Sequence, residues 1–90
     1  MISVYQEERL KEMRTYPKMR EIGVFIRKFS REHGYAPSYR NLQEGCNISS
    51  TSVVQFYLNK MRGEGLLFYA NGVSRTVRLT DDGKKILNAW

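Results

Sequence analysis

The chain has 90 residues and a formal net charge of +6. Its hydrophobic residues (41%) and charged residues (27%) are typical of one small globular domain, and these proportions exclude a disordered chain. A domain of this size buries only about 60% of its unfolded surface, which leaves little room for an internal catalytic cleft. We therefore expect no enzymatic activity. The basic excess favours a polyanionic partner, most often nucleic acid.

Other classes are excluded by what the sequence lacks. Cys46 and His33 are the single cysteine and histidine, too few for a disulfide framework or a zinc site, so we expect no metal or cofactor. The N-terminus does not have the pattern of a signal peptide. The longest apolar run, Leu66 to Ala70, is far shorter than a membrane span. We expect a cytoplasmic protein without membrane association, and no small-molecule ligand is evident.

The charge excess lies in the middle of the chain. Residues 1–16 carry three basic and three acidic side chains, and residues 80–90 carry two of each, so the whole excess falls within 17–79. Inside that span, residues 48–59 contain no charged side chain. The pattern fits a protein whose Lys and Arg contact phosphates while neutral side chains contact bases. Chance explains such a neutral stretch about equally well.

The central span begins with a predicted helix over 17–33. Its apolar residues recur at spacings of three and four, Pro17 suits the first turn, and Gly34 is a natural end. Thr15 or Tyr16 would cap its start.

A second and a third helix follow in short order. Pro37 prevents a helix at the residue before it, and Ser38 is a good N-cap for a short helix through about Glu44. A tight turn over 45–48 then leads to a third helix, with capping hydroxyls at residues 49–51 and an end near residue 64.

The pattern changes to β-structure after Gly65. Two β-prone runs, 66–70 and 76–79, are separated by residues 71–75. The Asn71-Gly72 pair predicts a hairpin because both residues tolerate positive φ.

We also expect a helix at each end of the chain. Thr80, followed by two aspartates, predicts the start of a last helix through about Leu87. Ser3 and Gln6 have the spacing of a capping box, which predicts a helix within 1–16. The apolar side chains of the two end segments would cover each other within one chain or across a homodimer, and the small size favours the homodimer. They are Tyr5, Leu10, Met13, Ile86, Leu87 and Trp90.

Together these elements predict one domain over 1–90 that is mainly α with a small β-hairpin. A helix, a short helix, a tight turn, a third helix and a hairpin form a winged helix-turn-helix, with a three-helix core and wing over 17–79. A helical extension (1–16) and a C-terminal helix (80–90) flank it. In this arrangement the third helix enters the major groove of DNA.

The third helix has one apolar and one neutral polar face. At 100° per residue, one face packs on the first two helices; it comprises Val54, Tyr57, Leu58 and Met61. Gln and Asn on the other face can pair with adenine, and Ser can donate or accept. Lys60 and Arg62 lie toward its C-terminal flanks, where phosphates are the natural partners. Phe56 would contact a thymine methyl, or else pack under the hairpin or in a dimer. The polar face comprises Ser49, Ser52, Gln55, Phe56 and Asn59.

Several short segments match the pattern of a known family. They are Gly34-Tyr35-Ala36-Pro37-Ser38, Ser50-Thr51-Ser52-Val53-Val54, Tyr57-Leu58 and the stretch from Gly65 through Ser74-Arg75-Thr76-Val77-Arg78-Leu79, together with Ile22 and Phe25-Ile26. With them, residues 19–79, about two thirds of the chain, resemble the N-terminal DNA-binding domain of LexA-type repressors. The self-cleaving peptidase domain of that family, which also supplies dimerisation, has no counterpart in this sequence. Gln55 and Phe56 stand where some members have acidic residues, so we do not expect a classical LexA operator.

The resemblance implies a role for three groups of residues. The third helix would contact bases in the major groove, the wing would lie near the backbone or the minor groove, and the start of the second helix would meet phosphates. The residues implied for bases are Ser50, Ser52, Val53, Gln55 and Phe56; for the wing, Asn71, Gly72, Ser74 and Arg75; for phosphates, Ser38, Tyr39 and Arg40.

The leading interpretation is a sequence-specific regulator that binds double-stranded DNA and represses transcription by occluding an operator. One such domain makes few contacts, so specificity would need two half-sites and hence a dimer or tandem sites. Two alternatives stay open. One is a winged-helix protein-interaction module, and the other is a non-specific or architectural DNA-binding protein in replication or packaging.

Overall fold

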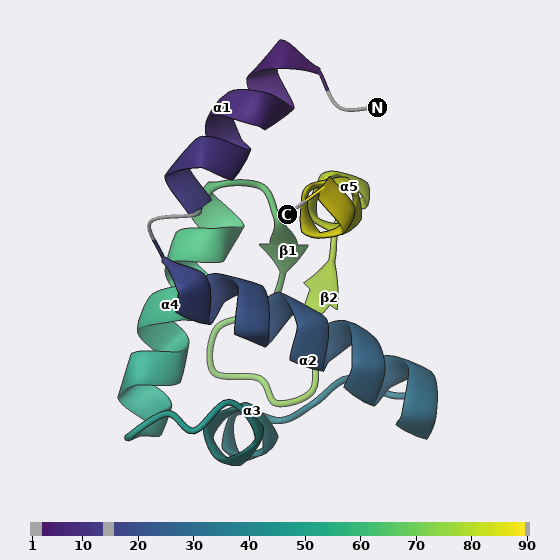
Figure 1. Ribbon diagram of the computed structural model, residues 1–90. Helices are drawn as coiled ribbons and strands as arrows, with labels where there is room; N and C mark the ends of the chain where they lie inside the picture. Colours follow the sequence, from purple (N-terminus) through teal and green to yellow (C-terminus); the bar gives the residue numbers. More distant parts are fainter. Residues whose placement is uncertain (1–2, 14–15, 90) are drawn as a thin grey trace.

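A computed structural model of the chain describes residues 3–13 and 16–89, and Figure 1 shows their arrangement. The order of elements is the one that the sequence predicts for a winged helix-turn-helix with additional terminal helices. The elements are α1 (Val4–Met13), α2 (Pro17–His33), α3 (Tyr39–Gly45), α4 (Thr51–Gly63), β1 (Leu67–Phe68), β2 (Arg78–Leu79) and α5 (Asp81–Ala89). No helix among the described residues is both long enough and apolar enough to cross a membrane.

Helix α2 begins and ends as its sequence predicts. Pro17 occupies the first turn, and Gly34 adopts φ 76° beyond the last residue, where its N–H donates to the carbonyl of Ser30 at 2.9 Å. Tyr16 occupies the N-cap position, but its side chain makes no capping hydrogen bond to the described residues. Thr15, the other predicted cap, lies outside the described residues.

The helix-turn-helix is fixed by two serine caps. The hydroxyl of Ser38 accepts from the N–H of Asn41 at 3.0 Å, and the Asn41 side chain accepts from the N–H of Ser38 at 3.0 Å. This reciprocal pair satisfies two N–H groups at the start of α3. The hydroxyl of Ser50 accepts from the N–H of Val53 at 3.3 Å and starts α4. The turn between them passes through Asn47 at φ 53°.

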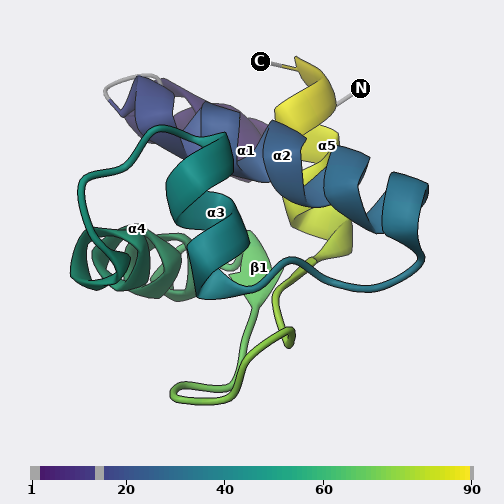
Figure 2. The ribbon, with the colours of Figure 1, turned by 90° about the horizontal axis from the view of Figure 1, so that it is seen from below.

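The hairpin is shorter than predicted. Leu67 pairs with Leu79 and Phe68 with Arg78, in antiparallel register, and the ladder stops there. Beyond it, the hydroxyl of Thr76 accepts from the N–H of Ala70 at 2.9 Å and so replaces a strand-to-strand bond. The loop between β1 and β2, called the wing below, projects from the helices (Figure 2).

The tip of the wing contains the turn that the Asn71-Gly72 pair predicts. Its backbone bond runs from the N–H of Val73 to the carbonyl of Ala70 at 3.0 Å. Gly72 has φ 77°, whereas Asn71 is not among the residues of positive φ. Positive φ at the third position alone is the pattern of a type II turn, which requires only one permissive residue. The predicted turn therefore forms at Asn71-Gly72, and of the two residues that tolerate positive φ only Gly72 uses it.

The two terminal helices pack against each other within one chain. Ser3 and Gln6 form the predicted capping box of α1, and the Gln6 side chain also donates to Asp82 of α5 at 2.8 Å. The hydroxyl of Thr80 accepts from the N–H of Gly83 at 2.9 Å and caps α5, which continues two residues past Leu87.

The burial of the predicted terminal apolar residues is uneven. Leu10, Ile86 and Leu87 are buried in the single chain, whereas Tyr5 is 59% exposed. The Met13 side chain and Trp90 lie outside the described residues. Leu10, Ile86 and Leu87 are therefore covered by other side chains of the same chain, and their burial does not require a homodimer.

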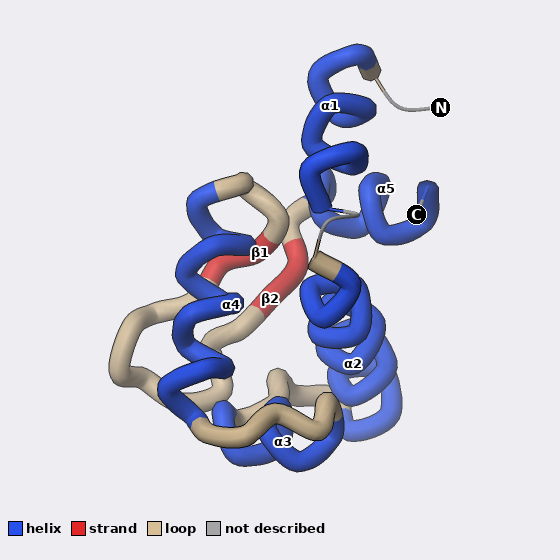
Figure 3. Tube along the Cα trace, turned by 60° about the vertical axis from the view of Figure 1, so that its left-hand side comes forward, coloured by secondary structure: helices blue, strands red, loops and turns tan. Residues whose placement is uncertain are grey.

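One core joins all the elements. It lies between α2, α3, α4 and the hairpin, and it is closed on the far side by α1 and α5. Figure 3 shows α4 against the hairpin and α3, with α2 on the other side of α3. The core therefore fixes which face of α4 turns outward. Its most deeply buried side chains include Ile22, Ile26, Leu42, Val54, Leu58, Leu67, Val77 and Ile86.

Candidate nucleic-acid interface

Helix α4 turns its apolar face inward, as predicted from its periodicity. Val54 and Leu58 have no exposed surface and Met61 is buried, while Tyr57 is half-buried against the core. The polar face lies opposite. Ser52, Phe56 and Asn59 are exposed, and Gln55 is half-buried, as are Ser50 and Val53 at the edge of the face.

The serines at the start of α4 differ in what they can offer a ligand. Ser49 and Ser52 are exposed. The hydroxyl of Ser50 is engaged in capping the helix, so its acceptor capacity is partly used. Val53 packs partly against the core and presents only part of its side chain.

Phe56 is the largest apolar group on the polar face. Its side chain is 57% exposed, and its ring meets the half-buried ring of Tyr57 edge-on at 5.4 Å between centroids. The exposure shows that Phe56 does not pack under the hairpin. An exposed aromatic side chain beside neutral polar groups is suited to an apolar contact with a thymine methyl or with a second protein surface.

Gln55 connects α4 to the wing, a contact that sequence reasoning did not find. Its side-chain N–H donates to the side-chain oxygen of Asn71. Asn71 lies in the turn at the wing tip, sixteen residues later. The two amides were predicted to contact different parts of a DNA site, and the fold places them together.

A second connection ties the end of α4 to the base of the wing. The hydroxyl of Tyr69 and the guanidinium of Arg62 both donate to the side-chain oxygen of Asn59, the latter at 3.0 Å. Arg62 also donates to the carbonyl of Tyr69 at 3.2 Å and lies 4.3 Å from the centre of its ring. Burial raises the pKa of Tyr69, which further favours the protonated hydroxyl that donates to Asn59.

These bonds limit what Asn59 can do. Its side-chain oxygen already accepts two hydrogen bonds, whereas its N–H₂ group lies on an exposed side chain and can still donate. It can therefore donate to a base acceptor such as thymine O4 or guanine O6, but it cannot form the two-way pair with adenine.

The three residues predicted to meet phosphates from α3 are not equally available. Arg40 is exposed. The Ser38 side chain is engaged in the capping box, and the Tyr39 hydroxyl is buried without a hydrogen-bond partner among the described residues. Arg40 is thus the one of the three whose side chain is free to reach an anion. At the end of α4, the Lys60 ammonium lies 4.7 Å from the centre of the Tyr16 ring.

The wing tip is exposed, but its last residue is held back. Asn71, Gly72 and Ser74 are exposed. Arg75 takes φ 60°, and its guanidinium donates to the carbonyl of Ala36 at 3.0 Å and to the Asn41 side chain at 3.3 Å. This contact orients the wing relative to the helix-turn-helix.

Comparison with known proteins decides the family. The family model described as the LexA DNA binding domain matches residues 17–76. The chain belongs to this family. The match covers α2, α3, α4, β1 and most of the wing, so the LexA DNA-binding domain here is flanked by α1 and α5 outside the matched residues.

Curated relatives agree with this assignment. The LexA repressor of Roseiflexus sp. (strain RS-1) is 44% identical over 62 residues, which are 69% of this chain and 28% of that protein. The LexA repressor of Herpetosiphon aurantiacus is 36% identical over 69% of this chain and 29% of that protein. The LexA repressor of Clostridium botulinum is 34% identical over 76% of this chain and 34% of that protein. The LexA DNA-binding domain described here thus spans about a third of their length. No solved structure matches it significantly.

Proposed function

We propose that this LexA-type domain binds double-stranded DNA sequence-specifically through the polar face of α4 and represses transcription by occluding an operator. The main observation that supports this proposal is that α4 has an uncharged, exposed face next to the wing, in a basic domain of the LexA family. Sequence similarity to relatives named as LexA repressors supports the regulatory role.

Base contacts are assigned to the polar face and its edge. Gln55 has both amide functions and suits adenine, although its N–H₂ group bonds to the wing in the free protein. Phe56 suits a thymine methyl, and Asn59 suits a base acceptor. The full set proposed for bases is Ser49, Ser50, Ser52, Val53, Gln55, Phe56 and Asn59.

Phosphate contacts are assigned to the flanks. Arg40 has the most available cation, and the backbone around Ser38 and Tyr39 would approach the same strand. Lys60 and Arg62 would have to leave their aromatic neighbours, or contact phosphates at the outer edge of those stacks. Asn71, Gly72, Ser74 and Arg75 form the wing contact to backbone or minor groove.

We further propose that two copies bind an inverted repeat, because one domain contacts too few base pairs for useful discrimination. The terminal helices remain the proposed site of self-association. Their inner apolar residues are covered within the chain, so the contact would use outer residues such as Val4 and Tyr5, which are 74% and 59% exposed.

The experiment that tests the function is selection from a random-sequence duplex library at near-physiological salt, followed by sequencing of the retained DNA. An enriched inverted repeat is the expected result, and its half-site spacing reports how the two copies are placed. Retention without an enriched motif would instead identify an architectural DNA-binding protein. Absence of retention would leave a protein-interaction module.

A further inference from the structure

A basic groove lies on the side of the domain away from α4. It is an open groove lined by residues of α2, β2 and α5, has a volume of about 550 Å³, and includes the apolar side chains of Ile26 and Leu79. In Figures 1 and 2, α4 and α5 lie on opposite sides of the molecule. The groove is therefore separate from the face of α4 assigned to bases. Its cationic lining residues, which define the basic groove below, are Arg27, Arg31, Arg78 and Lys84.

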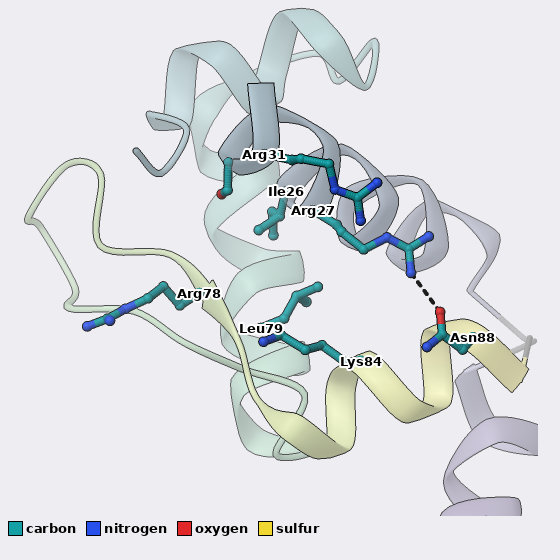
Figure 4. Close-up of a pocket in the computed structure, with 8 residues that line it drawn as sticks. Ile26, Arg27, Arg31, Arg78, Leu79, Lys84 and Asn88 are labelled. Carbon is teal, nitrogen blue, oxygen red and sulfur yellow. Dashed lines mark hydrogen bonds between the residues drawn. The ribbon is translucent and has the colours of Figure 1, made fainter. Parts of the chain in front are cut away.

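Among the described residues, the cations of the basic groove have no acidic partner. None of the lining residues is acidic, and neither ion pair found among the described residues, Lys18–Glu21 and Lys28–Glu32, involves them. Arg27 makes one neutral hydrogen bond, to the side-chain oxygen of Asn88 at 2.8 Å. Figure 4 shows the guanidinium groups of Arg27 and Arg31 extending toward the same side, while Arg78 extends in the other direction. Four cations without an acidic partner along one groove create a positive potential that favours a bound anion.

The basic groove continues into a second hollow at the base of the wing. This hollow has a volume of about 450 Å³ and shares Ser30 and Arg78 with the basic groove. Its other lining residues include Arg75 and Tyr35, which join the wing to the helix-turn-helix. A line of cations therefore runs from the wing, which is part of the proposed DNA interface, to α5.

From this continuity we propose that the basic groove binds phosphates of duplex DNA flanking the recognised half-site, on the wing side. The inference rests on the proposed function. Arg side chains hold phosphate oxygens through paired N–H donors, and Lys acts as a point charge. The Cα positions extend over 34 × 25 × 21 Å, so flanking DNA reaches the basic groove within about one helical turn if it bends past the wing toward α5.

The test compares two duplexes and two matched variants. One duplex carries only the selected site, and the other extends it by about 10 base pairs beyond the wing. R31Q/K84Q removes one exposed cation from α2 and one from α5 inside the basic groove. K28Q/K85Q removes one exposed cation from each of the same helices outside it, with the same change in net charge. Affinity is measured by fluorescence anisotropy over a salt series.

For the wild type, we expect the extension to tighten binding roughly tenfold at 0.1 M salt, and the salt slope to steepen by about 2 because each phosphate contact adds about 0.9. R31Q/K84Q should lose this gain while binding the short duplex nearly as well as the wild type. K28Q/K85Q should keep the gain.

Several results would overturn the proposal. A wild type that gains nothing from the extension, or equal gains in the wild type and R31Q/K84Q, would reject DNA as the occupant. Binding of ATP to the basic groove in NMR titrations, without any length effect, would assign the phosphate site to a free ligand instead; binding of an acidic peptide there would assign it to protein. A library selection without a motif rejects the proposed function itself, which separates that failure from this one.

Discussion

The guanidinium of Arg75 lies 4.8 Å from the centre of the Tyr35 ring. Tyr35 belongs to the loop between α2 and α3, whereas Arg75 ends the exposed part of the wing and takes φ 60°, a conformation that non-glycine residues adopt only where contacts maintain it. Two of the segments that carry the family resemblance, 34–38 and 74–79, therefore contact each other. Tyr35 and Arg75 therefore have a structural role, which is to orient the wing, and this role does not require contact with DNA.

We expect a measurable coupling between these two side chains. A double-mutant cycle of Arg75→Ala and Tyr35→Ala should give a coupling free energy of unfolding of about 0.5–1 kcal/mol, the usual size for an exposed cation–π pair. Urea denaturation of the four proteins measures it. The cycle also removes the separate contribution of the Tyr35 contact with Phe29. Strictly additive single losses would show that the stack does not hold the wing.

The substitution Arg75→Lys tests whether Arg75 anchors the wing through its guanidinium hydrogen bonds or acts only through its positive charge. Lysine keeps the positive charge, but it cannot reproduce the guanidinium bonds to the Ala36 carbonyl and the Asn41 side chain. If the anchor matters, Arg75→Lys should raise the mobility of residues 71–75 in backbone ¹⁵N relaxation. Relaxation unchanged from the wild type would indicate that the charge alone is used.

A third prediction concerns how α4 and α3 divide their contacts. Gln55→Ala should relax the preference at one base pair of the selected site, at a cost of about 1–3 kcal/mol for the preferred base. Arg40→Ala should weaken binding to all sequences alike and reduce the salt slope by about 1. Competition anisotropy with single-base variants of the site measures both. A uniform loss for Gln55→Ala would place this residue outside direct base recognition.

The sequence predicted elements wherever local chemistry determines them. Helix α2 begins at Pro17 and ends before Gly34, and α3 begins at the Ser38 capping box. Each of these signals acts over a few neighbouring residues and does not depend on the rest of the fold. Helical periodicity likewise predicted the buried face of α4. The short ladder was not predicted, because it depends on the Thr76 hydroxyl replacing a backbone partner.

The missed features of the site all involve contacts between distant parts of the chain. Gln55 bonds to Asn71, and Asn59 and Arg62 bond to Tyr69, across loops that no local pattern describes. The basic groove has the same origin, because it combines cations from α2, β2 and α5. Only the three-dimensional arrangement shows that Asn59 lacks a free acceptor and that Tyr39 cannot offer its hydroxyl.

Two glycine substitutions should have opposite effects on stability. A Cβ at Gly83 would overlap the backbone carbonyl of Leu66, which cannot move aside without shifting the base of the hairpin. Gly83→Ala should therefore lower the free energy of unfolding by about 2–3 kcal/mol. A Cβ at Gly63 would meet no atom within 4 Å, and this residue does not have a positive φ. Gly63→Ala should thus be neutral or stabilise by up to about 1 kcal/mol. Thermal denaturation of both variants checks the contrast, and equal effects would contradict the close packing of α5.

The burial of Cys46 should make the free energy of unfolding fall at alkaline pH. Its side chain is buried in the turn after α3, and this burial raises the thiol pKa from its ordinary value of 9.0 to about 11. Below pH 9 the thiol is protonated in both the folded and the unfolded chain, so its full contribution is present. Between pH 9 and 11 only the unfolded chain ionises, and stability falls by about 2–3 kcal/mol. Urea denaturation at about pH 8 to 11 should show this fall in the wild type and a smaller one in Cys46→Ala, whose lost packing costs the same at every pH. Parallel pH profiles of the two proteins would mean that the thiol ionises equally in both states.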